Sequence, residues 1–269
     1  MTAEPTPLAR WQVAYAALRR SEGRGGSASA RLALPYVTTG PVAVQWRVRA
    51  RTYDRFVGEV LAPLERSIGR PLAILDLGAG DGWLSARMAE RGHFALAFDI
   101  RLDAVDGLGA GADFARRIGR GFARVAAPFD ALPVGDAAFD LAVFNASLHY
   151  ASDLSRALAE ARRAVRTGGR IAILDSPFYR RPEAGEAMVR EKERRTRETF
   201  PDLADGLLAL RTIEYLTPER LAAAASPLGL DFRRIRVRYP LSYELRGLRA
   251  LVRRERPPSR FDLWVSEAR

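Results

Sequence analysis

The chain has 269 residues, of which 48% are hydrophobic, and a formal net charge of +11, a composition that suits a folded protein with a hydrophobic core. It contains no cysteine, which excludes disulfides, thiolate zinc sites and cysteine nucleophiles. The N-terminus shows no secretory signal, and no charge-free apolar run reaches the roughly 18 residues that cross a membrane, so we expect a soluble, cytoplasmic protein.

The positive charge comes almost entirely from arginine, because Lys192 is the single lysine. Local clusters occur at residues 47–51, 194–197 and 233–238. Aromatic residues are not interleaved with them in the manner of a base-stacking surface. We therefore favour a solvated basic surface and keep an anionic or nucleic-acid partner as the alternative.

Two helical stretches are predicted before the first strand. One covers residues 11–20, and the other covers residues 42–68, where apolar residues recur at helical spacing. Pro63 is expected to kink or split the second stretch. Residues 1–70 are thus predicted to form an N-terminal helical extension to a domain that covers residues 71–269.

Short apolar runs then alternate with helices. Strands are predicted at residues 72–77, 94–100, 122–126, 139–145 and 170–174, with helices at 82–91 and 154–165. Strands that alternate with helices at this pitch indicate a parallel sheet covered on both faces.

The pattern changes after the fifth strand. Residues 182–211 are charged and have a helical pattern, so we interpret a segment from about residue 176 to about residue 216 as a helical insertion. Residues 232–239 and 261–265 predict two final strands that are joined by a long basic connection.

A glycine-rich loop follows the first strand. Gly78, Gly80 and Gly82 stand at alternate positions, and glycine permits both positive φ and close approach of a ligand to the backbone. The helix that starts near Gly82 points its free amides at the same place. Asp99 ends the second strand 19 residues after Gly80, close to the roughly 20 residues that are typical of a ribose-binding acid. Together these features indicate a cofactor that contains a nucleoside.

The glycine spacing differs from that of dinucleotide-binding loops. Those loops read G-x-G-x-x-G, whereas Trp83 occupies the position of the last glycine here. A bulky side chain at this position opposes the close helix–strand packing over a pyrophosphate. The Gly-Lys-Ser/Thr of a P-loop is also missing. Dehydrogenases and nucleoside triphosphate hydrolases are therefore disfavoured, and a turn that merely packs strand against helix remains the alternative.

Four successive segments resemble class I S-adenosylmethionine-dependent methyltransferases. They are residues 76–82, Asp99, residues 131–140 with their Leu-Pro and Phe-Asp pairs, and residues 165–170 with their Gly-Gly turn. The resemblance covers about residues 72–175 and implies a three-layer, Rossmann-like α/β sandwich. Its sheet has seven mostly parallel strands and an antiparallel C-terminal strand. The implied activity is transfer of a methyl group from S-adenosyl-L-methionine, which becomes S-adenosyl-L-homocysteine, to an O, N or C atom of a small or medium-sized acceptor.

The resemblance also implies cofactor-binding residues. They are Asp76, Gly78, Ala79 and Gly80 at the methionine end, Asp99 at the ribose, Ile100, Phe129 and Asp130 at the adenine, and Asn145 beside the methionine. Pro128 departs from the family, because relatives place there an Asp that contacts the adenine amino group; Asp130 is the candidate substitute. Arg51 and Tyr53 are candidates to close over the methionine carboxylate, with a core aromatic as the alternative for Tyr53.

His149 follows the fourth strand, at the sheet edge where ligands bind in open α/β proteins. A near-neutral pKa would make it a general base, while packing against cofactor or substrate and an unrelated structural role are the alternatives. Tyr150, Phe178 and Tyr179 lie at the same edge and are the candidate substrate-binding residues. His93 is expected to be a surface turn residue, and no metal site is evident.

We therefore expect a methyltransferase that acts on a small-molecule acceptor. Two alternatives remain: an RNA or protein methyltransferase that uses the arginine-rich surface, and a non-catalytic binding protein with the same fold. The acceptor and the oligomeric state are not specified by any of these patterns.

Overall fold

The computed structural model describes residues 4–24, 28–119 and 121–269. Within these residues, seven strands form one sheet in the order β3-β2-β1-β4-β5-β7-β6. They are β1 (Ala73–Leu77), β2 (Phe94–Asp99), β3 (Ala123–Ala126), β4 (Phe139–Asn145), β5 (Val165–Leu174), β6 (Arg233–Ile235) and β7 (Leu263–Glu267). Neighbouring strands from β3 to β5 are parallel, and β7 is antiparallel to both β5 and β6. The predicted fold class is confirmed.

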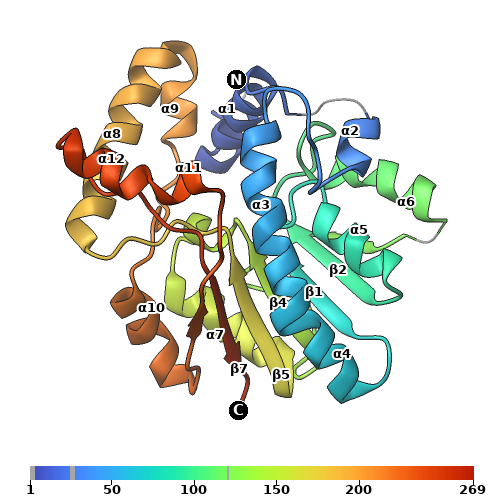
Figure 1. Cartoon of the computed structure of the whole chain (residues 1–269). Coiled ribbons are helices and arrows are strands. Elements are labelled where there is room, and N and C mark those ends of the chain that lie inside the picture. Colours follow the sequence, from blue (N-terminus) through green and yellow to red (C-terminus); the bar gives the residue numbers. More distant parts are fainter. Residues whose placement is uncertain (1–3, 25–27, 120) are drawn as a thin grey trace.

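Helices cover both faces of this sheet and its upper edge (Figure 1). They are α1 (Pro7–Ser21), α2 (Ala28–Leu32), α3 (Ala43–Phe56), α4 (Ala62–Ile68), α5 (Trp83–Glu90), α6 (Ala112–Ile118), α7 (Leu154–Ala164), α8 (Pro182–Thr199), α9 (Ala204–Leu207), α10 (Pro218–Ala225), α11 (Leu241–Glu244) and α12 (Arg246–Val252). Among the described residues, none of these helices combines the length and the apolar character that a membrane crossing demands.

Two hydrophobic cores lie on opposite faces of the sheet. Alternate residues of β1 pack into one core or the other, because successive side chains of a strand point to opposite faces. Ile74 packs into the core under α3, α4 and α5, and Leu75 packs into the core under α7 and α10. Apart from Asp76, the residues of β1 are therefore apolar, as expected of a strand that is buried on both sides.

Residues 43–68 form one nearly continuous helix that contains a π-helical turn (Val57–Leu61). In this turn the amide of Ala62 donates to the carbonyl of Val57, five residues earlier. Pro63 follows directly, and a proline ring clashes with the carbonyl four residues before it in a regular helix. We interpret the wider turn as the way in which this helix continues through Pro63, where a kink or a break was predicted.

The helices that lie above the carboxyl ends of the parallel strands include α1, α8, α9, α11 and α12 (Figure 1). α1 packs closely on α9, since a Cβ atom at Gly206 would lie 2.7 Å from the Cβ of Ala14. α11 and α12 lie within the connection between β6 and β7, for which no helix was predicted. These helices cover the sheet edge at which the predicted site residues lie.

Candidate active site

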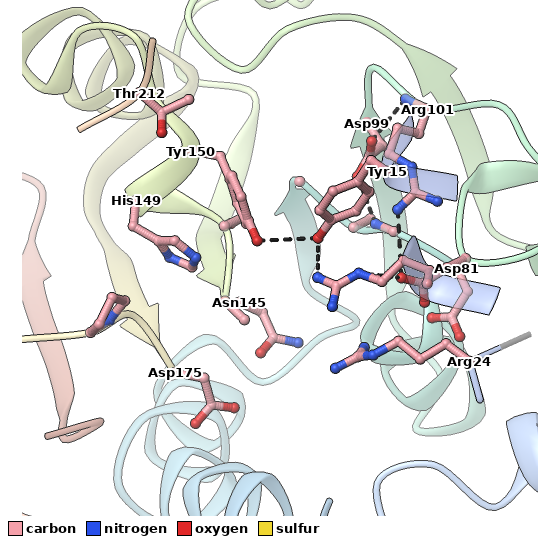
Figure 2. Close-up of a pocket in the computed structure, with 18 of the residues that line it drawn as sticks. Tyr15, Arg24, Asp81, Asp99, Arg101, Asn145, His149, Tyr150, Asp175 and Thr212 are labelled. Carbon is pink, nitrogen blue, oxygen red and sulfur yellow. Dashed lines mark hydrogen bonds and ion pairs between the residues drawn. The ribbon is translucent and has the colours of Figure 1, made fainter. Parts of the chain in front are cut away.

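A cavity of about 960 Å³ opens at the carboxyl edge of the sheet. Its wall combines the loop after β1, the ends of β2, β4 and β5, and residues from α1, α3, α11 and α12. Figure 2 shows His149 and Tyr150 along one side of it and Asp99 and Tyr15 along the other. The volume is at the upper end of the range for small-molecule sites, which leaves room for a cofactor together with an acceptor.

The glycine loop is fixed to the end of β2. The amides of Gly78 and Ala79 both donate to the carbonyl of Phe98, each at 2.8 Å. Gly78 has a φ of +74°, and a Cβ atom on it would lie 2.4 Å from the Cβ of Ser147. Only glycine fits here, so the loop offers bare backbone to the cavity.

Asp76 lies beneath this loop, buried at the end of β1 and outside the cavity wall. Its Oδ2 accepts hydrogen bonds from the amide of Ser85 at 3.1 Å and from the hydroxyl of Ser85 at 2.8 Å. Burial raises the pKa of Asp76 to about 7. The side chain therefore ties the first turn of α5 to the end of β1 and does not line the cavity, where it was predicted as a cofactor-binding residue.

Asp99 connects the glycine loop to the segment that follows β2. Its Oδ2 accepts from the amide of Gly80 and its Oδ1 accepts from the amide of Arg101, both at 2.8 Å. Burial raises the pKa of this carboxyl. Each carboxylate oxygen has a further lone pair, and the residue lines the cavity beside Ile100. This geometry fits the recognition of a ribose diol.

Pro128, Phe129 and Asp130 all line the cavity next to the glycine loop. The Phe129 ring meets Phe144 edge-on at 5.7 Å between centroids. The Asp130 carboxylate accepts from the hydroxyl of Ser152 at 3.3 Å. Asp130 thus lies in the cavity wall, close to Pro128. This is compatible with its predicted role as the substitute for the Asp that relatives place at position 128.

Arg49, on α3, lines the cavity, and it was not among the site residues predicted from the sequence. Its guanidinium lies 4.3 Å from the centroid of the Trp46 ring and 5.6 Å from that of Trp83. The Nε lies 3.3 Å from Oδ2 of Asp175, and an Nη donates to Oδ1 of Asn145, also at 3.3 Å. The ring stack and these two contacts hold a cation at the ends of β4 and β5.

The prediction for Arg51 and Tyr53 is wrong. Arg51 is exposed, and Tyr53 is buried with its ring edge-on to Trp83; neither lines the cavity. Residues three or four apart share a face of a helix, so Arg51, two residues after Arg49, points to another side of α3. Tyr53 lies on the same face as Arg49 but one turn further along the helix, where that face packs against the core.

α1 also contributes to the cavity wall, and none of its residues was among the predicted site residues. The hydroxyl of Tyr15 lies 3.1 Å from that of Tyr150 and accepts a hydrogen bond from Arg19 (Figure 2). Gln12 donates to the carbonyl of Ile100 at 2.6 Å. Tyr150, a candidate substrate-binding residue, therefore lines the cavity with its hydroxyl engaged by this helix.

His149 lines the cavity within a short 3-10 turn (Leu148–Tyr150). Its Nδ1 lies 3.5 Å from Oγ of Ser176, and its ring centroid lies 4.3 Å from that of Tyr150. Burial lowers the pKa of His149 to about 3, with nearby cations, Lys192 first, acting in the same direction. The imidazole is neutral at physiological pH and only weakly basic.

The placement predicted for Phe178 and Tyr179 is wrong, because both are buried outside the cavity wall. Phe178 stacks on Trp264 at 4.6 Å between centroids, and Tyr179 meets Tyr215 edge-on at 5.9 Å. Their amides donate to the carbonyls of Arg260 and Leu216. The chain leaves the cavity after Pro177 and pairs with these later segments instead.

Known proteins resemble this chain in sequence and in fold. The matching family model is described as a methyltransferase domain and covers residues 75–173. The malonyl-[acyl-carrier protein] O-methyltransferase of Methylococcus capsulatus is 32% identical over 228 residues, which are 80% of this chain and 78% of that protein. The enzyme of the same description from Erwinia pyrifoliae is 32% identical over 136 residues, which are 48% of this chain and 49% of that protein.

Two solved structures share the fold. Magnesium protoporphyrin IX methyltransferase from Synechocystis PCC 6803 superimposes with a TM-score of 0.58 and 13% identity, over 100% of both chains. The 1,6-didemethyltoxoflavin-N1-methyltransferase of Burkholderia thailandensis superimposes with a TM-score of 0.52 and 19% identity, over 99% of this chain and 92% of that one.

Proposed function

We propose that this chain, which belongs to the class I S-adenosylmethionine-dependent methyltransferases, methylates a carboxylate oxygen of an acyl group that is held as a thioester. The chain is an enzyme, and its cofactor is S-adenosyl-L-methionine. The relative from Methylococcus capsulatus is named for a malonyl group on acyl-carrier protein. A malonyl thioester has a free carboxylate at its far end, and this is the acceptor that we assign to the cavity.

The residues around the glycine loop fit this cofactor. In the proposed arrangement Asp99 holds the ribose hydroxyls, Ile100 and Phe129 enclose the adenine, and the bare backbone at Gly78 receives the methionine part. The cofactor supplies, when bound, a methyl group on a positively charged sulfur. The wall beyond the methionine end, which includes Arg49, His149 and Asp175, then faces the acceptor.

The acceptor proposal rests on one combination in this wall. The Arg49 guanidinium is held in place by Asp175 and Asn145, and His149 nearby has a lowered pKa, which makes it a poor base. A carboxylate is already ionised at neutral pH, and the guanidinium N–H groups of Arg49 that Asp175 and Asn145 do not engage can donate to it. Methyl transfer to it forms one C–O bond and breaks one C–S bond, whose electron pair stays on sulfur, and no proton moves. An alcohol or an amine would require a base, for which the lowered pKa of His149 is unsuited.

The test is an incubation of the purified protein with S-adenosylmethionine and the malonyl thioester of N-acetylcysteamine. The expected product is the methyl ester, identified by mass spectrometry and by its hydrolysis in mild base. The acetyl thioester, which has no free carboxylate, is the matched control and is expected to stay unmodified. Methylation of the acetyl thioester, or none of the malonyl one, would refute the proposal.

His149→Gln is expected to lower kcat by less than about fivefold, because a neutral, weakly basic imidazole removes no proton in this reaction. The folded pKa lies near 3, so the histidine is uncharged throughout pH 6–9, and kcat of the wild-type enzyme should be flat over this range. Steady-state rates of both proteins at several pH values check this. A loss of about a hundredfold or more would instead identify His149 as a general base.

A further inference from the structure

Helices α11 and α12 expose an apolar stripe to solvent. Its members are Leu241, Leu245, Leu248, Leu251 and Val252, with exposed fractions of 73%, 36%, 59%, 74% and 77%. Spacings of three and four residues place most of them on one side of these consecutive helices, while Ala250 is buried on the inner side. Aliphatic side chains gathered in this way on a surface commonly mark an interaction site.

Three exposed arginines flank the stripe: Arg249, Arg253 and Arg254. Within the described residues, no carboxylate lies at ion-pair distance from any of them. Other arginines of the same segment are paired, since Arg256 contacts Glu191 and Arg260 contacts Glu244. We call the stripe together with the three flanking arginines the α11–α12 surface.

This surface lies on two helices that also contribute to the wall of the active-site cavity. Tyr243 and Arg246, on the same two helices, line the cavity. The Arg246 guanidinium lies 3.5 Å from the centroid of the Tyr243 ring and donates to the carbonyl of Ser259 at 3.0 Å. In Figure 1 both helices lie above the carboxyl edge of the sheet. A partner on this surface would thus stand next to residues that line the cavity.

We infer that the α11–α12 surface docks an acidic carrier protein that delivers the acyl acceptor to the cavity. The inference rests on the proposed function, which requires a thioester-bound acceptor. Uncompensated arginines around aliphatic side chains complement a partner with acidic side chains around an apolar patch. An anionic membrane is the less favoured occupant, because helices that lie in membranes commonly present Trp or Phe on the apolar face, and the one aromatic residue of these helices, Tyr243, turns to the cavity.

The test variant carries Arg249→Glu, Arg253→Glu and Arg254→Glu. Its matched control carries Arg66→Glu, Arg117→Glu and Arg233→Glu, which change the net charge equally at exposed positions elsewhere. For malonylated acyl-carrier protein, kcat/KM should fall at least about tenfold in the test variant and less than about twofold in the control. With malonyl-N-acetylcysteamine, both variants should stay within about twofold of wild type, because none of the six arginines lines the cavity.

Binding of fluorescently labelled, malonylated carrier protein, followed by anisotropy, gives a readout that needs no turnover. The wild type and the control should bind it and the test variant should not, and Leu248→Ser with Leu251→Ser should weaken binding in the same assay. If the carrier binds in this way but neither malonyl substrate is methylated, the docking surface stands and the proposed function fails.

Four results would overturn the docking surface. One is a wild type that does not bind the carrier protein. A second is a wild type that methylates the small thioester as efficiently as the carrier-bound one. Another is carrier binding that the triple charge reversal leaves intact. The last is that the wild-type protein co-sediments with phosphatidylglycerol vesicles, and that the triple charge reversal abolishes this while carrier binding is unchanged. That result would identify the surface as a membrane contact.

Discussion

Gly78→Ala is expected to weaken S-adenosylmethionine binding by about a hundredfold or more. The new Cβ would lie 2.4 Å from the Cβ of Ser147, a separation that two carbon atoms cannot adopt. The loop cannot simply retreat, because Gly78 and Ala79 donate to the carbonyl of Phe98. A shift of about 1 Å in a binding element of this kind can cost a factor of a hundred.

Gly92→Ala is the matched control. Gly92 has a φ of +91°, so alanine is strained there as well, but no atom lies within 4 Å of the added Cβ and the residue is not part of the cavity wall. Calorimetric titration should give this variant the affinity of the wild type. Ser147→Gly in the Gly78→Ala background should restore part of the binding, and equal affinities of Gly78→Ala and wild type would contradict the assignment of the loop.

The sheet and the glycine loop could be predicted because their signals are local. A buried parallel strand appears as an apolar run between turn residues, and the run at 72–77 became β1. Gly78, Gly80 and Asp99 lie at a spacing set by one strand–helix–strand unit, and the structure joins them through the bond from Gly80 to Asp99. The glycine pair at 168–169 was less informative: β5 starts at Val165, so the pair lies inside this strand rather than before it.

Residues that depend on packing between distant segments could not be predicted. His93 was expected at the surface, yet it is buried, with Nε2 2.7 Å from a carboxylate oxygen of Glu65 and Nδ1 accepting from the amide of Leu72. Tyr15 meets Tyr150 across 135 positions of sequence. Neither contact follows from the neighbourhood of one residue in the chain.

Two local patterns in the sequence bear on features outside the predicted set. Leu241, Leu245, Leu248 and Val252 recur at helical spacing, which is typical of a helix, and the structure has α11 and α12 in this basic connection. Trp46 and Arg49 are three residues apart in a helical stretch, so they share a face and can form a cation–π pair. The side of the helix that meets the cavity, however, follows only from the fold.

Neutralising the buried pair of Arg49 and Asp175 is expected to lower kcat/KM for the malonyl thioester by roughly thirty- to a thousandfold, about 2–4 kcal/mol of transition-state stabilisation. The variant is Arg49→Gln with Asp175→Asn. Both residues are changed because removal of the arginine alone would leave Asp175 buried without its cation, a loss that destabilises folds strongly. Asp175→Asn alone is the matched control, and it should retain most of the activity.

Arg49→Lys separates the charge from the shape of the guanidinium. Lysine keeps the cation but loses the planar fork and the stack on Trp46, so kcat/KM should fall by about tenfold, mainly through a higher KM for the acceptor. The calorimetric affinity for S-adenosylmethionine should stay within about threefold in all three variants, with unfolding midpoints as the control for folding. If cofactor affinity falls instead and the acceptor KM is unchanged, Arg49 binds the methionine carboxylate. The acceptor carboxylate would then have to be held by another cation of the wall, such as Arg246.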